Sequence, residues 1–172
     1  MNEADRLDLP TAAAIGASRE SEDTGLASRI GRLVRERPYG VLCTQSQSQP
    51  YGSLVALAAT DDLATFVFST PITTRKYRLL SECEHVALVI DSRSGAPAEL
   101  MQVEAVTATG RAHVVPPGAD FERWAGLLLG RHPHLAAFVR AESSALVRVE
   151  VVRYFHVCRF QEVRQWVPSR TM

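Results

Sequence analysis

Residues 51–80 read YGSLVALAATDDLATFVFSTPITTRKYRLL, and this stretch decides the fold. It contains two runs rich in apolar and β-branched residues, 51–59 and 64–69, which are separated by a short polar turn. A similar run, 39–44, comes shortly before them. Strands joined by loops of only a few residues pair in antiparallel fashion, so we expect a three-stranded meander. A short helix over about 73–82 should follow it.

The rest of the chain adds further strands and a few helices. The additional β-type segments cover 85–91, about 101–115, about 145–160 and about 163–167. The predicted helices cover about 25–37, the apolar stripe that follows Gly118, and 133–139. Gly110 interrupts a long strand and predicts a bulge or bend. Six or more strands with few helices favour a closed or nearly closed barrel, because closure removes exposed sheet edges.

The charge balance and the cysteines limit the classes of function. Nineteen basic and nineteen acidic side chains cancel, so the net charge does not support nucleic acid or an anionic membrane as a partner. The three cysteines are odd in number and far apart, which predicts reduced thiols and a cytoplasmic protein. No apolar run approaches the roughly 20 residues that a membrane span needs.

The domain organisation follows from length and local composition. A chain of 172 residues suits one domain with a sizeable core. Residues 1–24 have no sustained apolar period, so we expect a flexible amino-terminal arm without the apolar core of a signal peptide. We expect residues 25–172 to form a single domain.

The candidate chemistry lies where a strand ends and a helix begins. Ser69 and Thr70 stand at the strand end, and Thr74, Arg75 and Lys76 stand at the helix start. The first N–H groups of a helix and the positive end of its dipole favour an anion. Arginine adds a bidentate fork and lysine a point charge. The segment predicts a phosphate site; a capped surface helix with ordinary basic residues is the alternative.

The order of these elements resembles the flavin-binding half of the split barrels related to pyridoxamine 5′-phosphate oxidase. The segments that carry the resemblance are PYGSLVA (50–56), FST (68–70), TTRK (73–76), HVALVID (85–91), TATGRA (107–112) and the late strand around Tyr154. The resemblance covers about residues 26–166. It implies a mainly β fold, namely an antiparallel six-stranded split β-barrel with a few peripheral helices. It also implies FMN as the cofactor and a homodimer with the flavin at the subunit interface.

Carried over onto this sequence, the resemblance assigns four residues to the flavin ring. Ser53, Leu54 and Val55 would lie along the edge of the isoalloxazine, where backbone N–H and C=O groups can meet its polar rim. Tyr154 falls near a position where the family supplies an aromatic residue from the other subunit.

The resemblance assigns five further residues to the rest of the cofactor. Ser69 and Thr70 would hydrogen-bond the flavin or its ribityl chain, and Thr74, Arg75 and Lys76 would hold the phosphate. No residue is identified as a general acid or base, so the catalytic residues stay unassigned.

The sequence also departs from the family's pattern. The true oxidases carry cations where this chain has Ser53 and Ala58, and the segment FQEVRQW (160–166) lacks their arginine-and-histidine cluster that grips the substrate phosphate. We therefore expect an FMN-dependent oxidoreductase that acts on an unidentified small substrate and not on vitamin B6.

Other functions stay open at this stage. The chain could be a non-catalytic flavin-binding or sensing protein, and a deazaflavin could take the place of FMN. Because related split barrels include haem-binding and haem-degrading members, the resemblance also leaves open that the chain binds or degrades haem, with His85, His113 or His156 as an axial ligand. His132 and His134 have no carboxylate or cysteine near them in the sequence, so no metal site is predicted.

Overall fold

A seven-stranded antiparallel sheet forms the centre of the computed structural model, which describes residues 19–93, 102–158 and 162–169, with side chains from Gly25 onward. The strands are β1 (Tyr39–Ser46), β2 (Gln49–Ala59), β3 (Thr65–Pro71), β4 (His85–Asp91), β5 (Ala105–Val114), β6 (Ser144–Cys158) and β7 (Glu162–Trp166). Their order is β3-β2-β1-β4-β5-β6-β7, and an additional pairing of β3 with β6 closes six of them into a barrel. The predicted six-stranded antiparallel barrel is confirmed.

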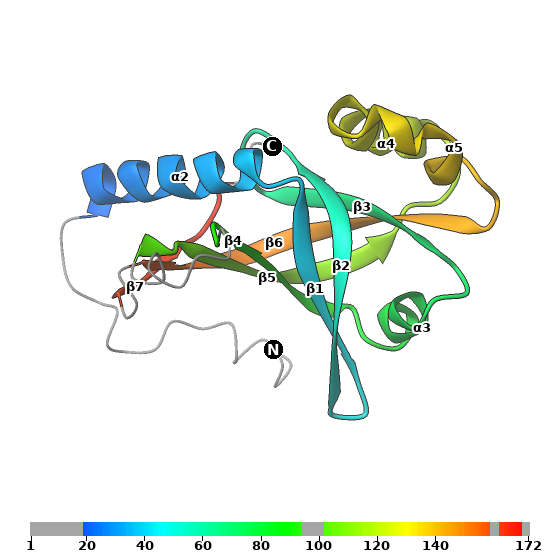
Figure 1. Ribbon diagram of the computed structural model, residues 1–172, viewed down its shortest axis with the longest axis horizontal. Coiled ribbons are helices and arrows are strands. Elements are labelled where there is room, and N and C mark those ends of the chain that lie inside the picture. Colours follow the sequence, from blue (N-terminus) through cyan, green and yellow to red (C-terminus); the bar gives the residue numbers. More distant parts are fainter. Residues whose placement is uncertain (1–18, 94–101, 159–161, 170–172) are drawn as a thin grey trace.

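Helices lie on the outside of the barrel (Figure 1). They are α2 (Arg19–Glu36), α3 (Arg75–Glu82), α4 (Ala119–Arg131), the single turn η3 (Pro133–Leu135) and α5 (Ala136–Val139). The first helix begins at Arg19, so residues 19–24, which we expected in the arm, are helical. The remainder of the expected arm, 1–18, lies outside the described residues.

Every second side chain along the strands points into the barrel and fills its interior. Inward-facing residues such as Leu42, Leu88 and Ala108 are completely buried, and their neighbours in the chain point to the outer face. The apolar stripe of α2, which includes Ile30 and Leu33, packs against the same core. Burial of this stripe, more than helix propensity, holds the helix in place.

A second apolar cluster lies on the outer face of the barrel beneath α4 and α5. Ala58 of β2, Val67 of β3 and Leu146 of β6 contact Leu128 of α4 and Val139 of α5 there. The two helices therefore seal one side of the barrel wall (Figure 1).

Gly110 marks a bulge, as the sequence predicted. The pairing of β5 with β6 shifts register between Thr109 and Gly110. A side chain at Gly110 would collide with the backbone carbonyl of Glu150 on β6, so the close approach of the two strands requires glycine.

The barrel opens along the outer edge of β2. Strand β3 pairs with β6 over seven residues, Thr65–Pro71, but with β2 only over Leu57–Ala59. Residues 49–56 of β2 therefore pair with β1 on one side and with no described strand on the other. Helix α3 lies beside this opening, and the candidate site is built there.

Candidate functional site

The start of α3 is held by two threonine hydroxyls. Thr74 is the N-cap, and its Oγ1 accepts a hydrogen bond from the N–H of Tyr77 at 3.3 Å and donates to the carbonyl of Pro71 at 2.8 Å. Thr70 is buried, and its Oγ1 lies 3.0 Å from that of Thr74. Because Thr74 donates to Pro71, the proton between the two hydroxyls comes from Thr70. The pair fixes the strand-to-helix turn, so these hydroxyls position the helix start.

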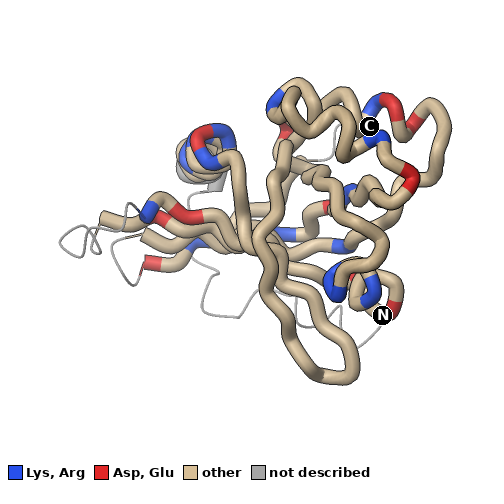
Figure 2. The backbone as a smooth tube through the Cα atoms, turned by 45° about the vertical axis from the view of Figure 1, so that its right-hand side comes forward, with Lys and Arg blue, Asp and Glu red and all other residues tan. Residues whose placement is uncertain are grey.

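A hollow of about 560 Å³ runs along α3 from its amino end. It is lined by Ile72, Thr73, Thr74, Arg75, Tyr77, Arg78 and Ser81. Two cations and several hydroxyls face it, and no carboxylate is among its lining residues. Figure 2 shows the concentration of basic residues on this short helix. The hollow is suited to an anion such as a phosphate group.

Arg75 is placed by an aromatic ring. Its guanidinium carbon lies 4.9 Å from the centre of the Tyr51 ring on β2, a cation–π distance. No carboxylate pairs with Arg75 within the described residues, so its N–H donors stay available on the hollow side. A guanidinium without a carboxylate partner is well suited to bind an anion.

Lys76 points to a different place. Its Nζ donates a hydrogen bond to the backbone carbonyl of Leu54 at 3.0 Å, across the opening of the barrel. Partial burial lowers the pKa of Lys76. Lys76 is absent from the lining of the hollow, so the structure separates two cations that the sequence grouped together.

The three candidates on β2 differ in what they can offer. The Leu54 side chain is 66% exposed, whereas that of Val55 is buried in the core, so Val55 can contribute only backbone groups. The Ser53 Oγ is buried and has no hydrogen-bond partner within the described residues. An orphaned buried hydroxyl costs free energy unless a partner is supplied, and a bound ligand is one way to supply it.

Ser69 and Tyr154 make internal contacts. The Ser69 hydroxyl donates to the carbonyl of Ala145 on β6 at 3.1 Å. The Tyr154 side chain is completely buried, its hydroxyl donates to the carbonyl of Leu63 at 2.6 Å, and its ring packs against Phe66 and Trp166. In this structure Tyr154 belongs to the barrel core and does not lie with the other candidates.

Sequence reasoning missed Arg78 and Tyr51. Arg78 lines the hollow together with Arg75, and the Tyr51 ring makes a cation–π contact with the Arg75 guanidinium. A signal for Arg78 was present, because residues three apart lie on one face of a helix. Tyr51 had no local signal, since its contact with Arg75 depends on how β2 and α3 pack.

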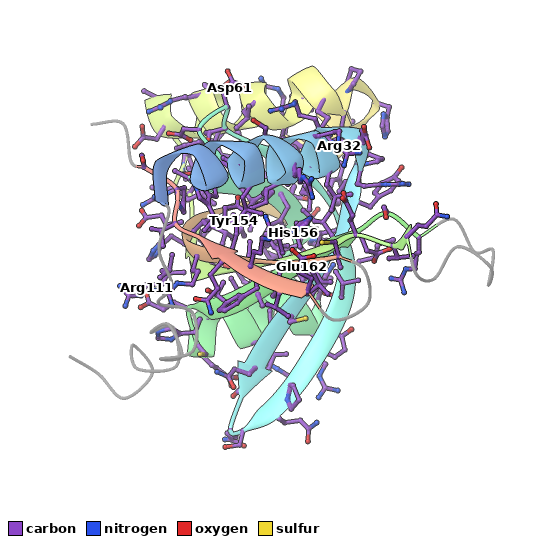
Figure 3. All side chains as sticks on the ribbon, turned by 90° about the vertical axis from the view of Figure 1, so that its left-hand side faces the viewer. Arg32, Asp61, Arg111, Tyr154, His156 and Glu162 are labelled. Carbon is purple, nitrogen blue, oxygen red and sulfur yellow. The ribbon has the colours of Figure 1, made fainter. Side chains whose placement is uncertain are left out.

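Within the described residues, no group of three or more histidine, cysteine or acidic side chains could hold a metal ion. His132 is buried, with Nε2 3.1 Å from the carbonyl oxygen of Leu57, and its ring packs against Tyr39 and His134. His156 is buried beneath α2, and neither ring nitrogen has a partner among the described residues (Figure 3).

The fold and site together define a split β-barrel with an arginine-lined hollow on α3. The family model of pyridoxamine 5′-phosphate oxidase matches residues 26–158, so the chain belongs to this family. The predicted family is thereby confirmed. No curated protein sequence matches the chain.

Solved structures share the fold at low sequence identity. A heme binding protein from Mycobacterium smegmatis is 16% identical with a TM-score of 0.71; the match covers 88% of this chain and 60% of that one. A FAD-binding protein from Mesorhizobium loti is 13% identical with a TM-score of 0.61, over 76% of this chain and 92% of that one. HutZ, the heme storage protein from Vibrio cholerae, is 16% identical with a TM-score of 0.60, over 83% and 94%.

These matches establish the architecture alone, because all three identities are low. The chain spans only 60% of the length of the mycobacterial protein. In the part of the chain that the structure describes, no helix has both the length and the apolar character to cross a membrane.

Proposed function

We propose that the protein binds FMN in the opening between β2 and α3 and uses it as an oxidoreductase on a small substrate. The observation that carries the proposal is the hollow on α3, with its two arginines, next to an open strand edge. Arg75 and the first N–H groups of α3 would hold the phosphate. The backbone of Leu54 and the unpartnered hydroxyl of Ser53 would meet the ring.

The residues present fit such a cofactor. A phosphate needs cationic and N–H donors, and the hollow supplies both without a competing carboxylate in its lining. A flavin ring needs hydrogen-bond donors and acceptors along one of its edges. The backbone N–H and C=O groups on the outer edge of β2 can supply them, because residues 49–56 have no strand partner on that side in the described chain. Bound FMN would supply the redox chemistry, while the protein binds and orients it.

The phosphate assignment is tested by comparing FMN with riboflavin, which lacks the phosphate. We expect the wild type to prefer FMN, and Arg75→Met to weaken FMN binding by about 10- to 100-fold with little change for riboflavin, because one charge-assisted contact is lost. Equal affinities of the wild type for both ligands would show that the hollow is not a phosphate site.

A turnover assay distinguishes an oxidoreductase from a protein that only binds the flavin. Oxidation of NADH or NADPH by the FMN-loaded protein, at a rate that free FMN does not reach, would identify an oxidoreductase. Tight FMN binding without any turnover would favour the non-catalytic flavin-binding or sensing role. The same titrations with a deazaflavin test that alternative cofactor.

We also propose that the protein does not oxidise pyridoxamine phosphate. The position where true oxidases carry a second cation is Ala58, which is sealed beneath α4 in the apolar cluster. A charge there would be buried without a partner, which is strongly unfavourable. Efficient formation of pyridoxal phosphate by the FMN-loaded protein would overturn this proposal.

The proposed functional unit is a homodimer. An outward-facing row crosses five strands through the register Leu54, Val41, Val89, Thr107, Phe155. Except for one threonine the row is apolar, and a second copy of the chain would bury it together with the open edge of β2.

Light scattering should give twice the chain mass, and Val89→Asp should give a monomer with weakened FMN binding. A wild-type monomer with saturating FMN would contradict the dimer.

Haem is the second candidate, because two proteins of similar fold are named for it. His85 and His113 are half-buried and are the histidines best placed to become ligands without opening the core. A Soret band on haem titration that disappears in one histidine variant, combined with weak FMN binding, would favour this function.

A cytoplasmic location is proposed with the function. Its support is that all three cysteines are unpaired, as expected in a reducing compartment. Fractionation of cells that express the tagged protein tests it.

A further inference from the structure

Arg75 and Lys76 are neighbours in the chain, but their side chains reach different places. Arg75 lines the hollow and lies over Tyr51, whereas the Lys76 ammonium is bound to the carbonyl of Leu54 at 3.0 Å. Consecutive residues of an α-helix point roughly 100° apart, so the divergence follows from helix geometry. A residue three positions after Arg75 returns to the same face, and Arg78 occupies that position in the hollow.

We propose that Lys76 is a ring-contact residue of the flavin site and not a phosphate ligand, and that Arg78 is the second phosphate cation beside Arg75. This inference rests on the proposed function. It divides the three basic residues of α3 between two parts of the same ligand.

Lys76 has N–H donors left over for a flavin ring. A lysine ammonium has three N–H donors, and the carbonyl of Leu54 takes one of them. The other two lie at the opening of the barrel, beside the strand edge where the polar rim of a flavin ring would come. Carbonyl oxygens on that rim can accept from them, and an acceptor there would offset the partial desolvation that lowers the pKa of Lys76.

Arg78 lines the hollow on the same helix face as Arg75. Arg78 and Arg75 face it together with the Thr73 and Ser81 residues, and no carboxylate of the described chain pairs with Arg78. Two guanidinium groups on one helix face repel each other unless an anion lies between them. A phosphate is an anion with enough acceptor oxygens to serve both.

The test compares two matched variants of one helix, Lys76→Met and Arg78→Met, in the full chain. Dissociation constants for FMN and riboflavin are measured by fluorescence, and thermal melting confirms that each variant is folded. We expect Lys76→Met to weaken both ligands by the same factor, roughly tenfold, because the lost contact is to the ring that both share. Arg78→Met should weaken FMN by about 10- to 100-fold and leave riboflavin unchanged. Lys76→Arg, which keeps a long side chain with N–H donors, should recover most of the riboflavin affinity.

Each other outcome overturns the inference in a recognisable way. If Lys76→Met weakens FMN and spares riboflavin, Lys76 is a phosphate ligand and only the proposed function stands. If it changes neither ligand, Lys76 merely caps the edge of β2. If Arg78→Met leaves the preference for FMN intact, the second phosphate cation lies elsewhere. If the wild type binds neither flavin, the proposed function fails and this inference fails with it.

Discussion

At the scale of single residues, Tyr154 makes a buried hydrogen bond that fixes a turn. Its hydroxyl donates to the carbonyl of Leu63, a residue with a left-handed backbone (φ 59°) in the turn between β2 and β3. That conformation is unfavourable for leucine by about 1–2 kcal/mol. Asp62 holds the same turn by accepting from the Thr60 hydroxyl at 2.6 Å and the Ala64 N–H at 2.9 Å, which lowers the pKa of Asp62. The buried tyrosine helps to keep a strained turn in place.

Tyr154→Phe tests this role. The change leaves the carbonyl of Leu63 buried without its partner, so we expect the free energy of unfolding to fall by about 1–3 kcal/mol. Thermal melting would record this as a lower Tm, by about 2–4 °C per kcal/mol for a chain of this size. FMN affinity should not change. Unchanged stability with lost FMN binding would return Tyr154 to the cofactor site.

At the scale of elements, the hairpin of β1 and β2 carries a strained turn. The register pairs Ser46 with Gln49, which leaves a two-residue turn at Gln47 and Ser48. Both residues have positive φ, 49° and 63°. Such hairpin turns favour Asn-Gly because asparagine and glycine tolerate this backbone. The sequence predicted a turn here, but its polar residues did not indicate which type.

The double change Gln47→Asn with Ser48→Gly should stabilise the protein. Relief of the left-handed strain outweighs the extra freedom of glycine in the unfolded chain, and we expect a gain of about 0.5–1 kcal/mol. Denaturant unfolding with an unchanged m-value measures it. As a control, Gly52→Asn on the adjacent strand should bring no gain. A loss of stability in the turn variant would mean that the turn does not have this geometry.

At the scale of the whole molecule, α2 lies over the end of the sheet and covers His156 (Figure 3). Burial is the main cause that lowers the pKa of His156, and the positive charges of Arg29 and Arg164 lower it further. The carboxylates of Glu104 and Glu162 raise the pKa, but their effect is smaller than that of burial. Burial in the folded protein therefore disfavours the protonated imidazole. Protonation would place a charge beneath α2, where neither ring nitrogen has a partner among the described residues.

The stability of the protein should therefore fall in mild acid. The pKa of His156 is lower in the folded chain than its ordinary value of about 6.5, so the unfolded chain takes up the proton first as the pH falls. The contribution of the neutral His156 to stability is fully present above about pH 6.5 and decreases below it. His156→Leu should show a smaller decrease between pH 7.5 and 5 in urea titrations. An identical pH dependence in both proteins would mean that His156 does not contribute.

Much of the fold was predictable from the sequence because it depends on local patterns. Strand β4 has the predicted bounds, and the bulge at Gly110 lies where the glycine interrupted the pattern. The other strands differ from their predicted ends by a few residues, and α2 begins six residues early. Alternation along strands, a helix cap at Thr74 and a breaking glycine are properties of neighbours in the chain.

The arrangement of the site was decided only by the tertiary structure. Local pattern brought Thr74, Arg75 and Lys76 to one helix start. The packing of α3 against β1 and β3 then brings Lys76 to the carbonyl of Leu54, which lies twenty-two residues away in the chain. Strand β3 pairs with β2 only over Leu57–Ala59, which leaves the rest of that β2 edge unpaired in the described chain, and the packing of the barrel interior buries Tyr154. Each of these outcomes depends on which strands pair and where a side chain points after they pair, and neither is encoded in the spacing of residues along the chain.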